Sequence, residues 1–171
     1  MGDDSTPSPV NSVEAIGPVL GRIPSGLSIL TARDGQENET GMLASWVQQA
    51  SFDPPVITIA VQNKRYLNDW LTEGTHVAVC LLSESNGQYL KHFGKGFEPG
   101  EPAFDGLDIA RSPAGLPVLT DTLGYLEGRI SGKMEPGDHI VYSVEITAAS
   151  IGPLLESEKP FVHIRKNGLG Y

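Results

Sequence analysis

The sequence has a single cysteine among its 171 residues, Cys80, so the chain cannot form an intramolecular disulfide. A protein without disulfides suits a reducing compartment, and we expect this one in the cytoplasm. Cys80 lies in the apolar run Val77–Leu82, which predicts a buried strand. We therefore expect a small core side chain at this position, with a reactive thiol as the alternative.

Long apolar runs are also missing, and none approaches the roughly 18–20 residues of a membrane-spanning helix. The first residues, Met1–Pro7, are acidic and lack the basic start and the apolar centre of a signal peptide. We therefore expect a soluble, intracellular protein.

Basic residues are scarce, because 12 Lys and Arg stand against 21 Asp and Glu and give a net charge of −9. Binding to nucleic acid or to an anionic membrane needs clustered cations, so we expect neither partner. The deficit is uneven along the chain, since residues 61–100 carry four acids and four bases. If the protein binds an anion, we expect the site in this middle stretch.

Glycine and proline are abundant, with 20 and 13 residues, and predict many short elements joined by turns. Strands are predicted over Leu27–Ala32, Gly41–Ala50, Val56–Val61, Val77–Leu82, Thr122–Met134 and His139–Ala149. Short helical patches are predicted after Ser12, where Gly17-Pro18 would interrupt the helix, and at Tyr66–Glu73 and Asn86–Phe93. The pattern favours a mainly β fold, a closed or nearly closed antiparallel barrel with a few short helices.

The chain organisation is simple. Residues 1–11 are polar with two prolines and are predicted to be a disordered lead-in. Residues 12–171 are then expected to form one domain, in which Asp34–Glu39 makes a hairpin turn and Glu135–Asp138 a tight turn between the two longest strands.

Motifs for nucleophilic catalysis, a phosphate P-loop and a paired-cysteine zinc site are absent from the sequence. The four histidines lie far apart in the chain, and no two of them have the i, i+4 spacing of helical metal ligands. We therefore expect no metal site.

One segment that could carry chemistry is the strand Gly41–Ala50, which runs on through Ser51 into the double-proline turn Asp53–Pro55. Small and polar residues at Ala44, Ser45, Gln48 and Ser51 would let a flat ligand approach the backbone. The alternative is that they form the solvent face of an ordinary strand, and the spacing favours neither interpretation.

A second segment, Gln62–Arg65, places two cations just before a helical patch, which suits a phosphate. Another cationic island lies at Lys91–Lys95; the alternative for both is solvated surface charge. A third segment, Gly137–His139, could place a histidine at the mouth of a pocket, although a histidine beside a turn more often has a structural role.

Together these segments resemble the flavin reductase-like family. The resemblance is carried by Ile23–Thr31, Gly41–Ser51, Phe52–Pro55 and Gly137–His139, in that order and separation. Gly41–Val47, Lys91–Phe93 and the ending from His163 make the chain most similar to the flavin reductase domain at the C-terminus of cyanobacterial flavodiiron proteins. The resemblance implies an FMN-binding split β-barrel of antiparallel, Greek-key topology that pairs as a homodimer.

The resemblance also implies roles for residues. The flavin ring would be lined by Met42, Leu43, Ala44, Ser45, Trp46, Val47 and Gln48, and held on its other side or along the ribityl chain by Ser51, Phe52 and Asp53. The phosphate would be received by Gln62, Lys64 and Arg65. Phe93 would cover the flavin or touch the dimer partner, Tyr171 would close the site, and His139 would lie near the nicotinamide as the residue with a catalytic role.

The expected function is that of an FMN-dependent NAD(P)H:flavin oxidoreductase, which moves a hydride from NADH or NADPH to flavin N5 and passes electrons to free flavin, oxygen or a redox protein. Two alternatives stay open. One is a non-catalytic FMN-binding module for electron transfer or sensing, and the other is a split barrel that uses no flavin.

Overall fold

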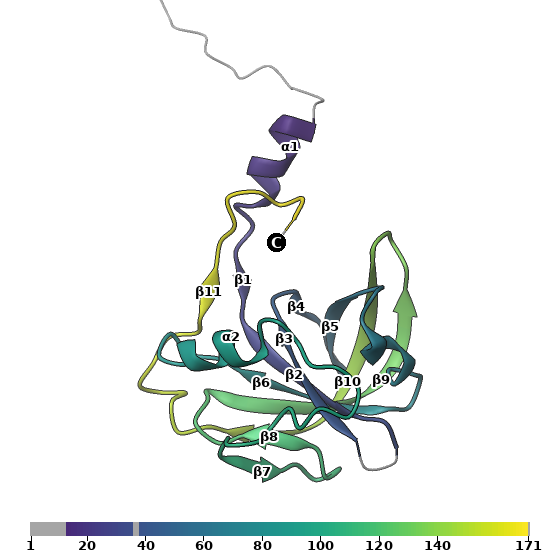
Figure 1. Ribbon diagram of the computed structural model, residues 1–171, viewed down its shortest axis with the longest axis vertical. Helices are drawn as coiled ribbons and strands as arrows, with labels where there is room; N and C mark the ends of the chain where they lie inside the picture. The colour runs from purple at the N-terminus through teal and green to yellow at the C-terminus, as the bar shows by residue number, and fades with distance from the viewer. Residues whose placement is uncertain (1–12, 36–37, 171) are drawn as a thin grey trace, which may run out of the picture. The chain divides into compact units, whose positions relative to one another are not determined.

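The computed structural model describes residues 13–35 and 38–170, which fall into two compact units. The larger unit, Gly26–Val162, is built on a seven-stranded antiparallel sheet of order β3-β2-β6-β9-β10-β5-β4 (Figure 1). Its strands are β2 (Ser28–Arg33), β3 (Glu39–Ala44), β4 (Val47–Phe52), β5 (Pro55–Gln62), β6 (His76–Leu81), β9 (Gly124–Met134) and β10 (His139–Ile151). The predicted mainly β, antiparallel fold is confirmed.

The connection between β3 and β4 closes this sheet. These two strands are its edges, yet only Ser45 and Trp46 separate them in the chain. Three Cα steps span at most about 11 Å, so the sheet has to curl until its edges meet here. The predicted single strand over Gly41–Ala50 is therefore wrong: the chain leaves one edge of the sheet at Ala44 and joins the other at Val47.

Both faces of β2 and β6 are buried, which explains their nearly continuous apolar sequences. Leu30 and Val79 belong to a core cluster shared with β5 and β10, while Ile29 and Cys80 belong to a second cluster on the other face. The second cluster is completed from α2 (Gly87–Phe93) and from the small sheet of β7 (Ile109–Arg111) and β8 (Pro117–Leu119). The prediction that Cys80 is a small core residue is confirmed by its complete burial.

The local predictions differ in accuracy. The turn over Glu135–Asp138 joins β9 to β10 as expected, and α2 lies within the predicted patch. The patch predicted over Tyr66–Glu73 is shorter, because only the four residues of η1 (Tyr66–Asp69) form a 3-10 helix. Such a short turn offers little of the dipole that a longer helix would present to a phosphate.

The smaller unit joins residues 13–25 to residues 163–170. Its helix α1 (Val13–Leu20) continues through Pro18, so the expected interruption is absent. The backbone N–H of Gly168 donates to the Gly17 carbonyl at 2.7 Å, and that of Arg165 donates to the Gly21 carbonyl at 3.0 Å. The short strands β1 (Ser25–Gly26) and β11 (Val162–His163) pair with each other. The predicted lead-in over residues 1–11 lies outside the described residues.

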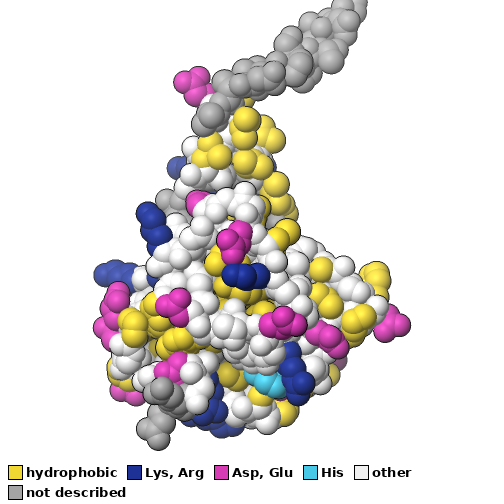
Figure 2. All heavy atoms as spheres, turned by 90° about the vertical axis from the view of Figure 1, so that its right-hand side faces the viewer, with side chains coloured by type: hydrophobic (Ala, Val, Ile, Leu, Met, Phe, Trp, Pro, Cys, Tyr) yellow, Lys and Arg dark blue, Asp and Glu magenta, His cyan; other side chains and the backbone are white. Residues whose placement is uncertain are grey.

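The surface of the larger unit mixes charges of both signs. Figure 2 shows acidic side chains spread over the visible face, with Lys and Arg side chains between them. Within the described part of the chain, we find no helix of the length and apolarity that a membrane crossing needs.

Candidate functional site

Two of the segments singled out in the sequence lie side by side at one end of β5 and β10. His139, the first residue of β10, is paired with Gln62, the last residue of β5. The turn that follows is held against Gly137–His139, because the Asn63 backbone N–H donates to the Asp138 carbonyl at 3.0 Å and the Asn63 side chain donates to the Gly137 carbonyl at 2.9 Å. Residues that lie 74 positions apart in the chain thus form one rim.

The β3–β4 connection brings the third segment to the same rim. The Trp46 carbonyl accepts a hydrogen bond of 3.0 Å from the backbone N–H of Ala60, near the end of β5. The Trp46 ring lies against His139, with 4.7 Å between ring centroids. The two ring planes are tilted by 44° to each other, and together they form a partly apolar aromatic wall that suits a planar heteroaromatic ligand.

Asp138 orients the imidazole of His139. The carboxylate Oδ1 of Asp138 lies 2.8 Å from Nδ1 of His139, and His139 is 7% exposed. The hydrogen bond to His139 and the charge of that ring lower the pKa of Asp138, with a smaller contribution from Lys64. An ionised carboxylate at Nδ1 accepts a hydrogen bond from the N–H of that nitrogen, so the neutral ring in this geometry is the Nδ1–H tautomer.

The side chain of Asn68, which the sequence analysis did not identify, stabilises the turn over residues 62–65. Its side-chain amide donates to the carbonyls of Gln62 at 2.8 Å and Arg65 at 2.9 Å. Its Oδ1 accepts a hydrogen bond of 3.0 Å from the hydroxyl of Tyr142, a buried residue of β10. An asparagine in a short turn is a weak signal by itself, and its partner lies 74 positions away.

Arg65 connects the turn over residues 62–65 with the second cationic segment, Lys91–Lys95. The guanidinium Nη1 of Arg65 lies 3.5 Å from the Lys95 carbonyl, a long hydrogen bond, and packs over Gly96. A small hollow opens between these elements, lined by Thr40, Gly41, Met42, Arg65, Tyr66, Leu67, Gly96 and Phe97. The Tyr66 hydroxyl donates to Thr40 Oγ1 at 2.9 Å, which fixes one wall of the hollow to β3.

Within the described residues, the cations Lys64 and Arg65 form no ion pair. Among the described residues, no carboxylate lies within 4.0 Å of Lys64 or Arg65, whereas Arg111 forms an ion pair with Glu39. Arg65 is partly buried, and Lys64 is exposed. A cation that is drawn from solvent without a counter-ion favours the binding of an anion.

Only some of the side chains predicted to line the flavin ring are accessible to a ligand, because the others pack into the core. Met42 and Ala44 are 9% and 2% exposed and belong to the core cluster inside the barrel, and Val47 packs against the same cluster. Leu43 packs against the second cluster. A ligand at this edge would therefore meet the backbone of these four residues, together with the side chains of Ser45, Trp46 and Gln48.

Phe93 does not have the exposure that covering a flavin would require. Its side chain is 1% exposed and lies in the second core cluster, beside the rings of His92, Phe97 and Phe104. A Cβ built on Gly41 would stand 2.5 Å from the Phe93 ring, so this ring lies directly against the backbone of β3. Phe93 packs against the backbone of β3 from within the second core cluster, so the expected role of covering the flavin is not available to its side chain.

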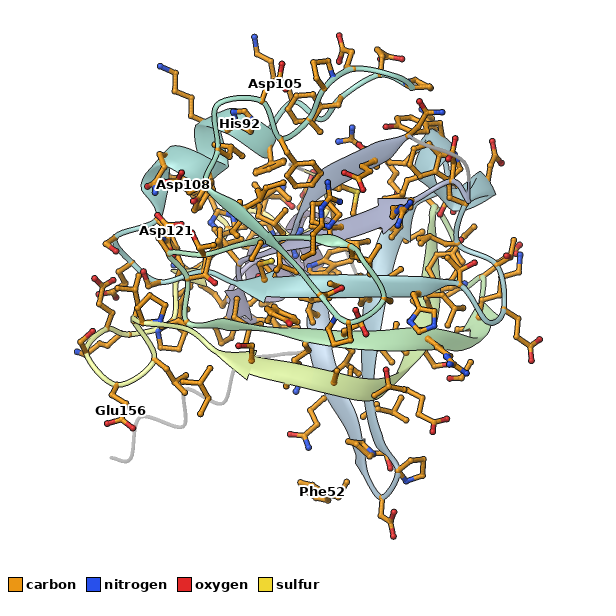
Figure 3. The ribbon with its side chains drawn as sticks, turned by 90° about the horizontal axis from the view of Figure 1, so that it is seen from below. Phe52, His92, Asp105, Asp108, Asp121 and Glu156 are labelled. Atoms are coloured by element: carbon orange, nitrogen blue, oxygen red, sulfur yellow. The ribbon has the colours of Figure 1, made fainter. Side chains whose placement is uncertain are left out.

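Ser51, Phe52 and Asp53 lie at the opposite end of β5 from the rim. The seven steps from Pro55 to Gln62 cover about 23 Å of strand, more than one flavin mononucleotide spans. Figure 3 shows Phe52 at the tip of the β4–β5 hairpin, and its side chain is 89% exposed. The structure thus divides the predicted cofactor residues into two groups, and Tyr171 lies outside the described residues.

Comparison with known proteins decides the family. A model of the family described as "Flavin reductase like domain" matches residues 20–168. The chain belongs to this family. It is also 46% identical over 126 residues to "Diflavin flavoprotein A 1" of Synechocystis sp., a match that covers 72% of this chain and 22% of that protein. The chain therefore spans about a fifth of the length of this relative.

Solved structures agree with this assignment. The NADH:FAD oxidoreductase SgcE6 of Streptomyces globisporus C-1027 is 25% identical and superposes with a TM-score of 0.77, over 86% of this chain and 85% of that one. The same protein in complex with NAD and FAD fragments superposes with a TM-score of 0.74 at 24% identity. The described chain therefore carries the split-barrel fold of an oxidoreductase of the flavin reductase type.

Proposed function

We propose that this flavin reductase-like oxidoreductase binds FMN and reduces it with NADH or NADPH. The observation that carries the proposal is the convergence of three distant segments, Ser45–Trp46, Gln62–Arg65 and Gly137–His139, on one rim. The second segment ends in the partly buried Arg65, which forms no ion pair with any described carboxylate. A site with one cationic patch suits the single phosphate of FMN, which is why we favour FMN over FAD.

The residues present fit this cofactor. Arg65 and Lys64 would hold the phosphate, with Gln62 beside them on the same turn. The ring would lie along the β3–β4 connection, where backbone groups of residues 42–47 and the side chains of Ser45 and Gln48 can hydrogen-bond to its polar edge. When bound, the flavin supplies the hydride-accepting N5 atom and the capacity to pass electrons onward.

The protein's own contribution is positioning. Trp46 and His139 form an aromatic wall at which a nicotinamide ring could be oriented, and Asp138 keeps the imidazole in one tautomer. The buried residues of β3 and the packing of Val47 against the barrel core make this wall rigid. No side chain has to act as a nucleophile or as a strong acid, which agrees with the absence of a catalytic motif in the sequence.

An anaerobic titration tests the activity. The purified protein reconstituted with FMN is mixed with NADH or with NADPH, and the flavin absorbance is followed. We expect bleaching with at least one donor, and a control without protein separates it from reduction of free flavin. If neither donor bleaches the bound flavin, the protein is instead a non-catalytic FMN module. If the protein takes up no FMN at all, both flavin hypotheses fail.

The phosphate assignment is tested by replacing Lys64 and Arg65 together with Ala. We expect FMN to bind at least about tenfold more weakly, since two charge-assisted contacts are lost, and the loss should be larger at low salt. Lys159→Ala, at an exposed position elsewhere, serves as the control.

His139→Ala should slow flavin reduction while FMN stays bound, and loss of the flavin from this variant would move His139 to the FMN site.

We also propose that the chain acts as a cytoplasmic homodimer in which the β4–β5 tip of one copy approaches the rim of the other. The distance between the two groups of predicted cofactor residues supports this, as does the exposure of Phe52, because a large exposed aromatic side chain is typical of an interface anchor. Phe52→Ser should shift the protein toward monomer in light scattering and weaken FMN binding. A monomeric wild-type protein would contradict the proposal. We propose free flavin or a redox protein as the acceptor of the electrons.

A further inference from the structure

Gly96 occupies a backbone position that controls the guanidinium of Arg65. Its φ angle is 78°, in the left-handed region that glycine adopts readily. A Cβ built on Gly96 would overlap Nη1 of Arg65, with the other guanidinium atoms next in line. Any other residue at this position would therefore force the Nη1 end of the Arg65 side chain to move.

The same loop also offers Arg65 a hydrogen-bond acceptor. The Lys95 carbonyl accepts from Nη1 at 3.5 Å, and the described residues place no carboxylate within 4.0 Å of this guanidinium. One long, neutral hydrogen bond leaves most of the five N–H donors of an arginine available for a ligand. The loop thus fixes where the guanidinium lies without neutralising its charge.

We propose that Gly96 is a positioning residue for the anion site, and that the loop around Lys95 and Gly96 aims Arg65 at the phosphomonoester end of the bound flavin. This inference rests on the proposed function, in which Arg65 receives the phosphate. It adds a second chain segment, 30 residues beyond Arg65, that determines selectivity for a phosphorylated flavin over one without phosphate.

The loop contains its own matched control. Gly100 has a φ angle of 84°, and a Cβ built there would meet no atom within 4 Å. Gly96→Ala and Gly100→Ala therefore impose the same left-handed strain on the same loop, and only Gly96→Ala adds the overlap with Arg65.

The experiment measures the affinity of each full-length variant for FMN and for riboflavin, which lacks the phosphate. We expect Gly96→Ala to weaken FMN binding about tenfold, the loss of roughly one charge-assisted hydrogen bond, and to leave riboflavin binding within about twofold. Gly100→Ala should leave the ratio of the two affinities unchanged. In an Arg65→Ala background, Gly96→Ala should have no further effect on FMN binding, since the overlap is gone.

Two results would overturn the inference: equal losses of FMN affinity in Gly96→Ala and Gly100→Ala, or equal losses of FMN and riboflavin affinity in Gly96→Ala. Should Gly96→Ala fail to fold while Gly100→Ala folds, Arg65→Ala should restore folding to the double variant, and a double variant that still fails to fold would overturn the inference. Failure of the proposed function is detected in the wild-type protein, before any variant is made. It would appear as equal affinity for FMN and riboflavin, or as bound flavin that neither donor bleaches.

Discussion

Replacing Asn68 with alanine should both destabilise the barrel and loosen the proposed phosphate site. The Asn68 side chain makes three good hydrogen bonds, to the carbonyls of Gln62 and Arg65 and from the hydroxyl of Tyr142. Tyr142 is 1% exposed, so water has little access to its hydroxyl once this acceptor is removed. Alanine at position 68 therefore leaves the phenolic hydroxyl without its protein partner, and the carbonyls of Gln62 and Arg65 keep only their backbone hydrogen bonds, from Arg65 N–H and the N–H of residue 68.

The size of the effect follows from these contacts. A net contribution of about 1 kcal/mol for each hydrogen bond gives about 3 kcal/mol of unfolding free energy lost in Asn68→Ala. Tyr142→Phe removes only one of the three bonds together with its donor, so about 1 kcal/mol is expected. The two variants should also differ in ligand binding, because only Asn68→Ala frees the turn that carries Lys64 and Arg65.

Urea unfolding of both variants measures the stability difference, provided that the dependence of the free energy on urea concentration is unchanged. FMN titration of the folded proteins then measures the consequence for the site. If Asn68→Ala is within about 0.5 kcal/mol of the wild type, the ordinary scatter of surface substitutions, the proposed anchoring is refuted. Equal FMN affinity in Asn68→Ala and Tyr142→Phe would refute the link between the anchor and the site.

Two further predictions follow from the titratable groups. The contact with His139 holds the pKa of Asp138 below its usual range, so ionised Asp138 stabilises the fold above its unfolded pKa of about 3.9, and the effect is lost as the pH falls through the lowered folded value. The urea midpoints of wild type and Asp138→Asn should therefore differ near neutral pH and converge in acid; a difference that grows in acid would contradict the assignment. Burial raises the pKa of the Cys80 thiol to about 12, so a thiol reagent at pH 8 should modify this residue only after denaturation, and rapid labelling of the native protein would show that it is accessible.

Much of the sheet could be predicted from the sequence because its signals are local. The run Val77–Leu82 is apolar and contains β-branched valines, and the turn over Glu135–Asp138 contains proline and glycine. The strands and their ends can therefore be predicted from residues that are neighbours in the chain. The break between β3 and β4 at Ser45–Trp46 contains no proline and no glycine. It is imposed by closure of the sheet, a long-range condition that leaves no local signature.

The sequence predicted which segments contribute to the candidate site, but it did not predict the contacts between them. The pattern of charges and turns identified Gln62–Arg65 and Gly137–His139, but the contact of Arg65 with the loop at Gly96 and that of Asn68 with Tyr142 depend on chain segments that meet only after folding. Phe93 shows the converse. An aromatic residue on a short helix looks the same in sequence whether it faces a ligand or the core, and here it packs against Gly41.

The two-residue link between β3 and β4 has a mechanical consequence. Because it ties together the outermost strands of the sheet, neither strand can swing away to pair with another chain without unrolling the whole sheet, which protects both edges from aggregation. Trp46 lies within this link and also against His139, so the residue that helps to fasten the sheet also forms the wall of the proposed site. Lengthening the link by a few residues would therefore release the barrel seam and the binding surface in a single step.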